Sequence, residues 1–315
     1  MLPTCKYIYV GSRFVLLKIE TSNTQQLSIC DFAQFYKLED LGIKEDPTAP
    51  DEDIALEHFH RTLRYDEGRY FASFPWNEFP PPISTNYRVA KGILDSQLEK
   101  LNCNPSLFIA YHNQIMENLR LGIIEIVPDN KIFKPSAHYI PHHGVFQEDK
   151  LRIVYNASAK TDKNPSLNDC IHRGPLLLEN LCSLLIEFCF HTIVLLADIE
   201  KAFLQIDLNK EDQDYVCFLW VDNDGNIVVF CFKRVPFGVN ASPFLLNAVI
   251  KTHLETSKYP IMKKIKAKWY ADNMVTRADN VEEALEIYKH AKELINNASM
   301  NLRHWISNLT KYVNR

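Results

Sequence analysis

The chain has 315 residues and a mass of 36.6 kDa, about twice the usual size of a single domain. With 46% hydrophobic and 23% charged residues, its composition is that of a globular protein, which excludes a disordered or fibrous chain. The net charge of −4 excludes a wholly basic nucleic-acid binder, so any polyanion would have to bind at a local basic patch.

The eight cysteines form no CxxC pair and no zinc-like spacing with histidine, which predicts reduced thiols in an intracellular protein. No apolar run approaches the ~20 residues that a membrane helix needs, and the N-terminus carries no secretory signal pattern. We therefore expect a cytoplasmic protein without a membrane partner.

The N-terminal part begins with two short apolar segments, residues 7–10 and 14–17, which predict strands. The acidic stretch from Glu39 to Glu57 follows and is typical of a linker. Three consecutive prolines at 80–82 have fixed φ angles and lack backbone donors, so they exclude regular structure at that point.

Two helices are predicted next. Asn86 can cap a helix over residues 87–101, and Asn104 with Pro105 supplies the N-cap and first position of a second helix. Gly122 ends the second helix.

Short apolar runs separated by turns then predict strands. An Asp-Gly pair at 224–225 supplies the positive φ of a hairpin turn, while a Ser-Pro pair at 242–243 and Asn280 each start a helix. Strands and helices mix without a regular βα alternation, which predicts an α+β fold. The predicted strands are 123–127, 152–155, 193–197, 216–220 and 227–232.

Two acidic residues, Asp198 and Asp272, each directly follow an apolar run. Asp198 follows the run from Thr192 to Ala197, and a buried strand can hold such a carboxylate rigidly as a metal ligand. Asp272 and Asn273 lie between the apolar flanks of a predicted hairpin over residues 268–275. The alternative for both sites is simple turn geometry, because Asp and Asn favour turns.

Two carboxylates held on strands can bind a pair of hard cations ~3.5–4 Å apart and assist an in-line phosphoryl displacement. This chemistry needs no side chain as general base. The 74 positions between Asp198 and Asp272 do not by themselves show that the two side chains meet.

Several ordered segments carry a family resemblance. ADIEKAFLQI (197–206), FKRVPFGVNASPF (232–244) and YADN (270–273) resemble motifs A, B and C of reverse transcriptases, most closely those of BEL/Pao long-terminal-repeat retrotransposons. Residues 150–160 and 166–175 are similar to the fingers and the fingers-to-palm passage of that group, and residues 53–59 resemble its upstream connector.

The resemblance implies an α+β right-hand polymerase, with fingers and a palm that has a split βαβ (ferredoxin-like) core. The expected divisions are a connector over 1–85, fingers over 86–190, and a palm over 191–315 that stops before the thumb. The implied reaction is RNA-directed DNA synthesis on an RNA or DNA template-primer from deoxynucleoside triphosphates. A retrotransposon polyprotein and its virus-like particle are the implied context.

By the same resemblance, Asp198 and Asp272 would bind two Mg²⁺ ions, for which Mn²⁺ can substitute, with the Ile199 carbonyl as a further ligand. Phe203 would lie under the nucleotide sugar and exclude a 2′-hydroxyl. The other implied nucleotide contacts are Lys150, Arg152, Phe237 and Gly238. From the residues alone, Phe203 could equally be a core aromatic, Gly238 a turn glycine, and Arg152 a solvated cation.

Basic residues supply two more candidates. The stretch with Lys258, Lys263, Lys264, Lys266 and Lys268 contains no acid and could meet the primer-template backbone, although lysines also protect edge strands from aggregation. His304 lies near the position at which the family carries a proton donor for the pyrophosphate leaving group. Histidine would serve there only in part, because its ordinary pKa is near 6.5.

The third motif departs from the family pattern of Tyr, any residue, Asp, Asp, because position 273 is Asn. An amide carries no negative charge, so one cation site loses electrostatic binding. We expect a weakened or inactive polymerase. The alternative is a catalytically silent remnant that only binds nucleic acid.

Overall fold

The structure is a computed structural model that describes residues 8–10, 13–15, 49–127, 137–147, 150–160, 164–178, 192–257, 259 and 269–308. The chain divides into two compact units, Met1–Asp51 and Glu52–Arg315. In the first unit, β1 (Ile8–Val10) and β2 (Arg13–Val15) pair antiparallel, which confirms strands in this region.

The acidic stretch that predicted a linker is a helix from its later part onward. Helix α2 (Ala49–Thr62) buries Ala55 and Phe59, which lie four positions apart and therefore on one face. This spacing gives the stretch an apolar stripe in spite of its charge, so the linker interpretation of these residues was wrong.

A small sheet joins the segment after α2 to the middle of the chain. Strands β3 (Arg64–Asp66) and β4 (Arg69–Ala72) form a hairpin, and β4 pairs in parallel with β9 (Asp207–Leu208). Residues 52–85 thus lie within the second unit and contribute to its core, whereas the divisions expected at residues 85 and 190 stay predictions.

The two helices predicted after the prolines are α3 (Tyr87–Asn102) and α4 (Pro105–Arg120). The Asn104 side chain accepts a hydrogen bond from the Leu107 amide, as a cap should. Asn86 does not cap α3 with its side chain, because its φ of 56° is left-handed and its amide donates instead to the carbonyls of Tyr139 and Ala159.

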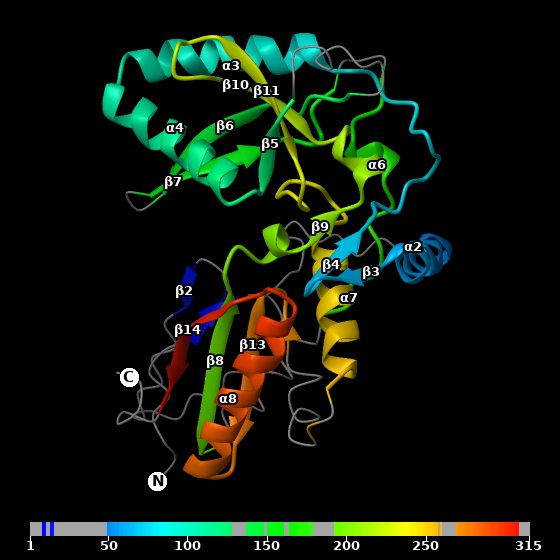
Figure 1. Ribbon diagram of the computed structural model, residues 1–315, viewed down its shortest axis with the longest axis vertical. Coiled ribbons are helices and arrows are strands. Elements are labelled where there is room, and N and C mark those ends of the chain that lie inside the picture. Colours follow the sequence, from blue (N-terminus) through cyan, green and yellow to red (C-terminus); the bar gives the residue numbers. More distant parts are fainter. Residues whose placement is uncertain are drawn as a thin grey trace, which may run out of the picture. The chain divides into compact units, whose positions relative to one another are not determined.

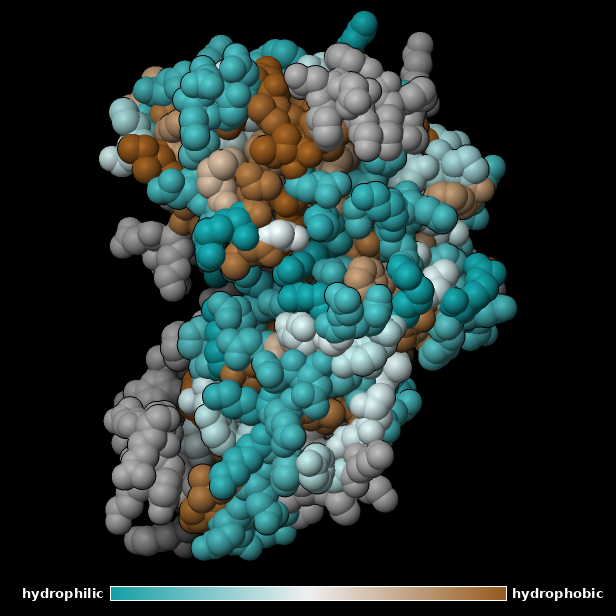
Figure 2. Space-filling model, viewed as in Figure 1, coloured by the Kyte–Doolittle hydropathy of each residue, from teal (hydrophilic) through white to brown (hydrophobic). Residues whose placement is uncertain are grey.

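The second unit also contains a hairpin and a three-stranded sheet. Strands β6 (His142–Gln147) and β7 (Lys150–Tyr155) pair antiparallel. In the sheet, β11 (Ile227–Phe232) lies between β10 (Cys217–Val221) and β5 (Ile124–Ile126). Figure 2 shows hydrophobic side chains gathered in the area of β10 and β11, and Ile126 and Ile227 are among the exposed apolar residues of this sheet.

One pair of cysteines contradicts the expectation of reduced thiols. Cys217 of β10 and Cys231 of β11 are directly opposite in the antiparallel register and form a disulfide. The sequence shows no such pairing, because the two residues are brought together by strand register and not by a spacing motif.

A four-stranded antiparallel sheet positions the acidic residues. Its order is β12-β13-β8-β14, so that β8 lies between β13 and β14 (Figure 1). Helix α8 joins β13 to β14 across β8, which makes the connection a split βαβ unit of the ferredoxin-like kind. The elements are β8 (Ile193–Ile199), α7 (Ser242–Glu255), β12 (Trp269–Tyr270), β13 (Asn273–Ala278), α8 (Val281–Asn297) and β14 (Leu302–Ser307).

The predicted signals for α8 and for the 224–225 turn are confirmed. Asn280 accepts a hydrogen bond from the Glu283 amide at the start of α8, and Gly225 has a φ of 84° between β10 and β11. Within the described parts of the chain, no helix has the length and apolar character needed to span a bilayer.

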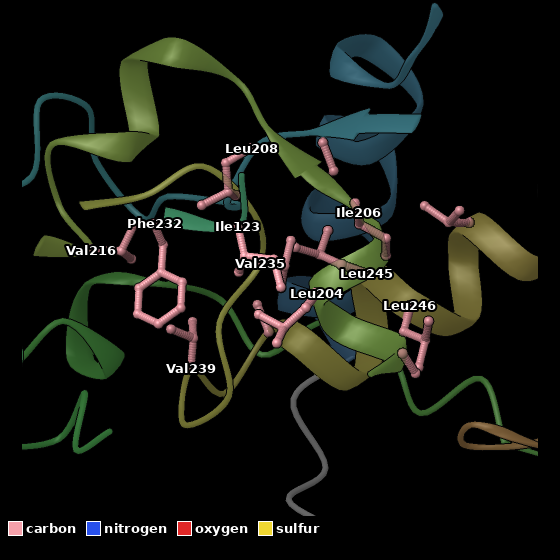
Figure 3. Packing of buried hydrophobic residues seen from close by; sticks show 14 of the residues in the cluster. Ile123, Leu204, Ile206, Leu208, Val216, Phe232, Val235, Val239, Leu245 and Leu246 are labelled. Carbon is pink, nitrogen blue, oxygen red and sulfur yellow. The ribbon is translucent and has the colours of Figure 1, made fainter. Parts of the chain in front are cut away.

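Apolar side chains from distant segments meet beneath the segment that follows β8. This segment contains the short 3₁₀ helix η4 (Ala202–Gln205) and then β9. Leu204, Val235 and Leu245 point toward one another (Figure 3). Because η4 and the start of α7 are packed against the same core, their positions relative to β8 are fixed.

Candidate active site

The structure brings Asp198 and Asp272 together at one end of the four-stranded sheet. Asp198 is the penultimate residue of β8, and Asn273 of β13 is its partner in the antiparallel register. Asp272 lies in the turn between β12 and β13, and its carbonyl accepts a hydrogen bond of 2.9 Å from the Ile199 amide. The pairing of β8 with β13 therefore places two carboxylates from distant sequence positions side by side.

The electrostatics of Asp272 reflect this proximity. Burial raises the pKa of Asp272 above its ordinary value, and the neighbouring charge of Asp198 raises it further, while Arg303 opposes both effects. Burial and the repulsion between the two acids both disfavour the ionised carboxylate. A bound cation offsets both effects, so the site favours cation binding.

The side chain of Asn273 contacts one of the two acids, Asp272. Its Nδ2 donates to Oδ1 of Asp272 over 2.9 Å. An aspartate at the same position could not donate, and would add a third negative charge to the site. Asn273 therefore satisfies one oxygen of Asp272 with a neutral hydrogen bond.

Strand β14 supplies two cationic or ionisable groups to Asp198. The Nε of Arg303 lies 3.4 Å from Oδ2 of Asp198, and Nδ1 of His304 lies 3.0 Å from Oδ1. His304 has a φ of 47° and lies where the register with β8 shifts, so a bulge turns it toward the acid. The His304 position is thus next to the carboxylates, although its role as proton donor stays a prediction.

Glu200 completes this cluster on the far side of Arg303. Nη1 of Arg303 binds Oε1 of Glu200 over 3.0 Å, and Asn301 donates to Oε2. Sequence reasoning did not single out Arg303 or Glu200. Arg303 is a charged residue within β14 and Glu200 directly follows β8, so their contact depends on the pairing of β14 with β8.

The donor set is of the type that Mg²⁺ prefers, because it consists of carboxylate oxygens. No group of three or more His, Cys, Asp or Glu side chains suited to a metal occurs among the described residues. Magnesium usually binds through one or two carboxylates, with water and substrate phosphates as further ligands, so Asp198 and Asp272 fit such a site. Whether the Ile199 carbonyl takes part stays a prediction.

Two aromatic residues predicted to contact a nucleotide touch each other. The ring of Phe203 in η4 meets that of Phe237 edge-on, with centroids 4.8 Å apart. Phe203 is half-buried and packs against the core, whereas Phe237 is 46% exposed. Phe203 is therefore in part the core aromatic of the alternative interpretation, and the pair presents one exposed ring.

Gly238 is required by a close approach between two backbone segments. Its φ is +95°, and a Cβ there would collide with the backbone carbonyl oxygen of Tyr155, at the end of β7. The glycine is thus more than a turn residue, because it lets the loop around Phe237 lie directly on β7.

The basic candidates are described only in part. Arg152 is exposed on β7, opposite Val145 of β6. Lys150 begins the same strand, but its side chain lies outside the described part of the structure. The lysines of the basic stretch also lie outside the described residues: Lys258, Lys263, Lys264, Lys266 and Lys268.

The sequence also missed Asn168. This residue lies in the short 3₁₀ helix η3 (Asn168–Cys170) and forms hydrogen bonds to both the loop at Gly238 and the turn after β7. Its segment resembled a known passage, but the residues themselves did not indicate a bridging role.

Residues 180–305 match the protein family described as "Reverse transcriptase (RNA-dependent DNA polymerase)". The matched range is less than half of the chain and includes both Asp198 and Asp272. We found no match among curated proteins.

Among solved structures, the foamy viral protease-reverse transcriptase dRH in complex with ds DNA is similar over 61% of this chain, with 17% identity and a TM-score of 0.43. The aligned part covers 31% of that viral chain, so the present chain spans about a third of its length.

Proposed function

We propose that the second unit contains, over residues 86–315, the fingers and palm region of an RNA-directed DNA polymerase from a BEL/Pao-type retrotransposon, impaired by Asn273. The observation that carries this proposal is the antiparallel pairing of β8 with β13, which places Asp198 beside Asp272 at the end of a ferredoxin-like sheet. The reverse transcriptase family match spans that same sheet.

In the proposed reaction, the primer 3′-hydroxyl attacks the α-phosphate of a deoxynucleoside triphosphate, and pyrophosphate leaves. Asp198 and Asp272 would hold Mg²⁺, or Mn²⁺ in its place, and bound cations supply charge stabilisation to such a displacement. The two aspartates would present their oxygen ligands from a rigid strand and a tight turn, so their backbone would stay in place while the cations displace the side-chain contacts.

Other residues would bind the nucleotide. Arg152 on β7 has the planar fork that matches phosphate oxygens and is exposed to receive them. Phe203 and the exposed ring of Phe237 would contact the sugar and base. An RNA or DNA template-primer would lie along the protein, with the basic stretch after α7 as its electrostatic contact.

The impairment follows from the groups that surround the carboxylates. Asn273 occupies an oxygen of Asp272 without adding negative charge, and Arg303 and His304 occupy both oxygens of Asp198. Cation binding must compete with these contacts, which favours weak metal affinity. The same observation favours the second candidate function, a domain that binds nucleic acid without catalysis.

Mg²⁺-dependent primer extension tests the proposal. We expect the unchanged chain to extend an RNA- or DNA-templated primer slowly, and Asn273→Asp to extend it about 10- to 1000-fold faster by restoring a ligand charge. The matched control is Asn113→Asp, which adds the same charge at an exposed position on α4, outside the carboxylate cluster.

Each outcome distinguishes the two candidate functions. No extension by the chain or by Asn273→Asp, together with salt-sensitive binding to a primer-template duplex, would select the binding domain. Equal rates for the chain and Asn273→Asp would show that position 273 does not limit catalysis.

A further inference from the structure

The loop around Gly238 is held by hydrogen bonds across its ends and at its middle. The Ser242 hydroxyl donates to the Pro236 carbonyl over 2.8 Å, which joins the two ends. The middle of the loop meets Asn168, which comes from a segment about 70 residues earlier in the chain. We call residues 236–242 the glycine loop.

Asn168 makes three hydrogen bonds to the glycine loop. Its Nδ2 donates to the Gly238 carbonyl over 3.1 Å, its Oδ1 accepts from the Asn240 amide over 2.9 Å, and its own carbonyl accepts from Nδ2 of Asn240 over 3.0 Å. Side chain and backbone of one residue thus bind both sides of the peptide segment 238–240.

The same residue also binds the turn that follows β7. The Asn168 amide donates to the Ala157 carbonyl over 3.1 Å, and Nδ2 donates to the Ser158 hydroxyl over 2.8 Å. Asn168 therefore bridges two segments that do not pair as strands: the turn after β7 and the glycine loop.

The bridge and the close packing at Gly238 act at the same place. Gly238 lies against the Tyr155 carbonyl, which ends β7, and Arg152 is three residues earlier in that strand. Next to Gly238 in the loop is Phe237, whose ring touches Phe203. A shift of the glycine loop would therefore change the position of Phe237 relative to Arg152.

Asparagine suits this position because its amide group donates and accepts at once. Aspartate would keep the acceptor for the Asn240 amide but lose both Nδ2 bonds. Asn240 cannot replace it as the centre of the bridge, because its own Oδ1 is buried without a partner in the described part of the chain.

We propose that Asn168 is a positioning residue for the nucleotide pocket, which fixes the glycine loop to the end of β7 and thereby sets the place of Phe237 relative to Arg152. This inference rests on the proposed function, since it assigns nucleotide binding to these residues. Asn168 touches no reacting group itself.

The kinetic test uses Asn168→Ala and Asn168→Asp in the Asn273→Asp background, with single-nucleotide primer extension as the assay. We expect Asn168→Ala to raise KM for the deoxynucleotide about tenfold while kcat changes less than about threefold. The KM of Asn168→Asp should lie between those of the parent and Asn168→Ala. The matched control is Asn113→Ala, the same change at an exposed position on α4. A fall in kcat without a change in KM, or an equal effect of Asn113→Ala, would overturn the proposal.

A second readout needs no catalysis. Hydrogen exchange of the peptide 237–241, measured by mass spectrometry, reports the Asn240 amide that Asn168 protects. We expect exchange there to become at least about tenfold faster in Asn168→Ala, while α8 keeps its protection. Unchanged exchange refutes the bridge. If the Asn273→Asp parent adds no nucleotide, the proposed function fails, and exchange still decides whether Asn168 holds the loop.

Discussion

Replacement of Gly238 by alanine tests the close packing between the glycine loop and β7. Two costs add at this position, because φ is +95° and because a Cβ would meet the Tyr155 carbonyl, which is backbone and has no rotamer to escape. The φ strain costs about 1–2 kcal/mol, and overpacking costs a further ~1–3 kcal/mol. We therefore expect Gly238→Ala to lower the free energy of unfolding by about 3–4 kcal/mol.

Gly225 provides a matched control, because it also has a positive φ, +84°, but no atom lies within 4 Å of an added Cβ. Gly225→Ala should show the φ cost alone. The difference between the two variants, about 2 kcal/mol, isolates the collision and corresponds to roughly 4–8 °C in Tm for a domain of this size.

Urea unfolding monitored by tryptophan fluorescence, together with thermal unfolding, measures both variants under one condition. Equal midpoints for Gly238→Ala and Gly225→Ala would mean that the glycine loop does not lie on β7. That result would also remove the basis for the Asn168 bridge.

Two further predictions concern the carboxylate site and the buried histidine His142. Arg303→Gln removes the cationic side chain that contacts Asp198, so calorimetric Mg²⁺ titration should give a Kd several-fold lower than that of the unchanged chain. The control Arg88→Gln, on the exposed side of α3, should leave the Kd for Mg²⁺ unchanged. A higher Kd for Arg303→Gln would contradict the competition between Arg303 and the cation. Burial lowers the pKa of His142 from 6.5 to about 4, so the unfolded chain binds a proton at this histidine more readily than the native state does. The contribution of neutral His142 to the free energy of unfolding is complete above pH 6.5 and falls by up to about 3 kcal/mol as the pH drops toward 4. His142→Gln should flatten that dependence of the urea midpoint on pH and exposed His143→Gln should not; the same slope in both variants would refute the assignment to His142.

Local signals in the sequence were enough to predict many elements. Asn104 and Asn280 cap their helices as expected, and Gly225 takes the predicted turn conformation. Such features depend on hydrogen bonds within a few residues, so the local sequence alone determines them. The hairpin of β12 and β13 at Asp272 belongs to the same class.

Where a local signal competes with tertiary contacts, the contacts decide. Asn86 has the residue type of a cap, but its amide binds the Tyr139 and Ala159 carbonyls and its backbone is left-handed. The acidic composition around residue 50 favours a linker, but burial of Phe59 makes the segment a helix. In both cases the partner lies outside the window from which the prediction was made.

The convergence of the acids illustrates the same division. The residue types at 198 and 272 indicated cation chemistry, and only the resemblance to a family suggested that they meet. The pairing of β8 with β13 brings them together, and the pairing of β8 with β14 adds Arg303, Glu200 and His304.

Local patterning along the chain was enough to predict many of the helices and strands and the residues that could carry chemistry, because those properties follow mainly from sequence neighbours. Which side chains meet, including Asn168 with the glycine loop and Arg303 with Asp198, depends on the packing of distant segments. Strand pairing is set by the burial of distant apolar surfaces, and a one-residue shift in the register of β14 against β8 would turn Arg303 to the other face of the sheet. The contact of Asn168 with the glycine loop depends instead on the packing of two loops that are far apart in the chain.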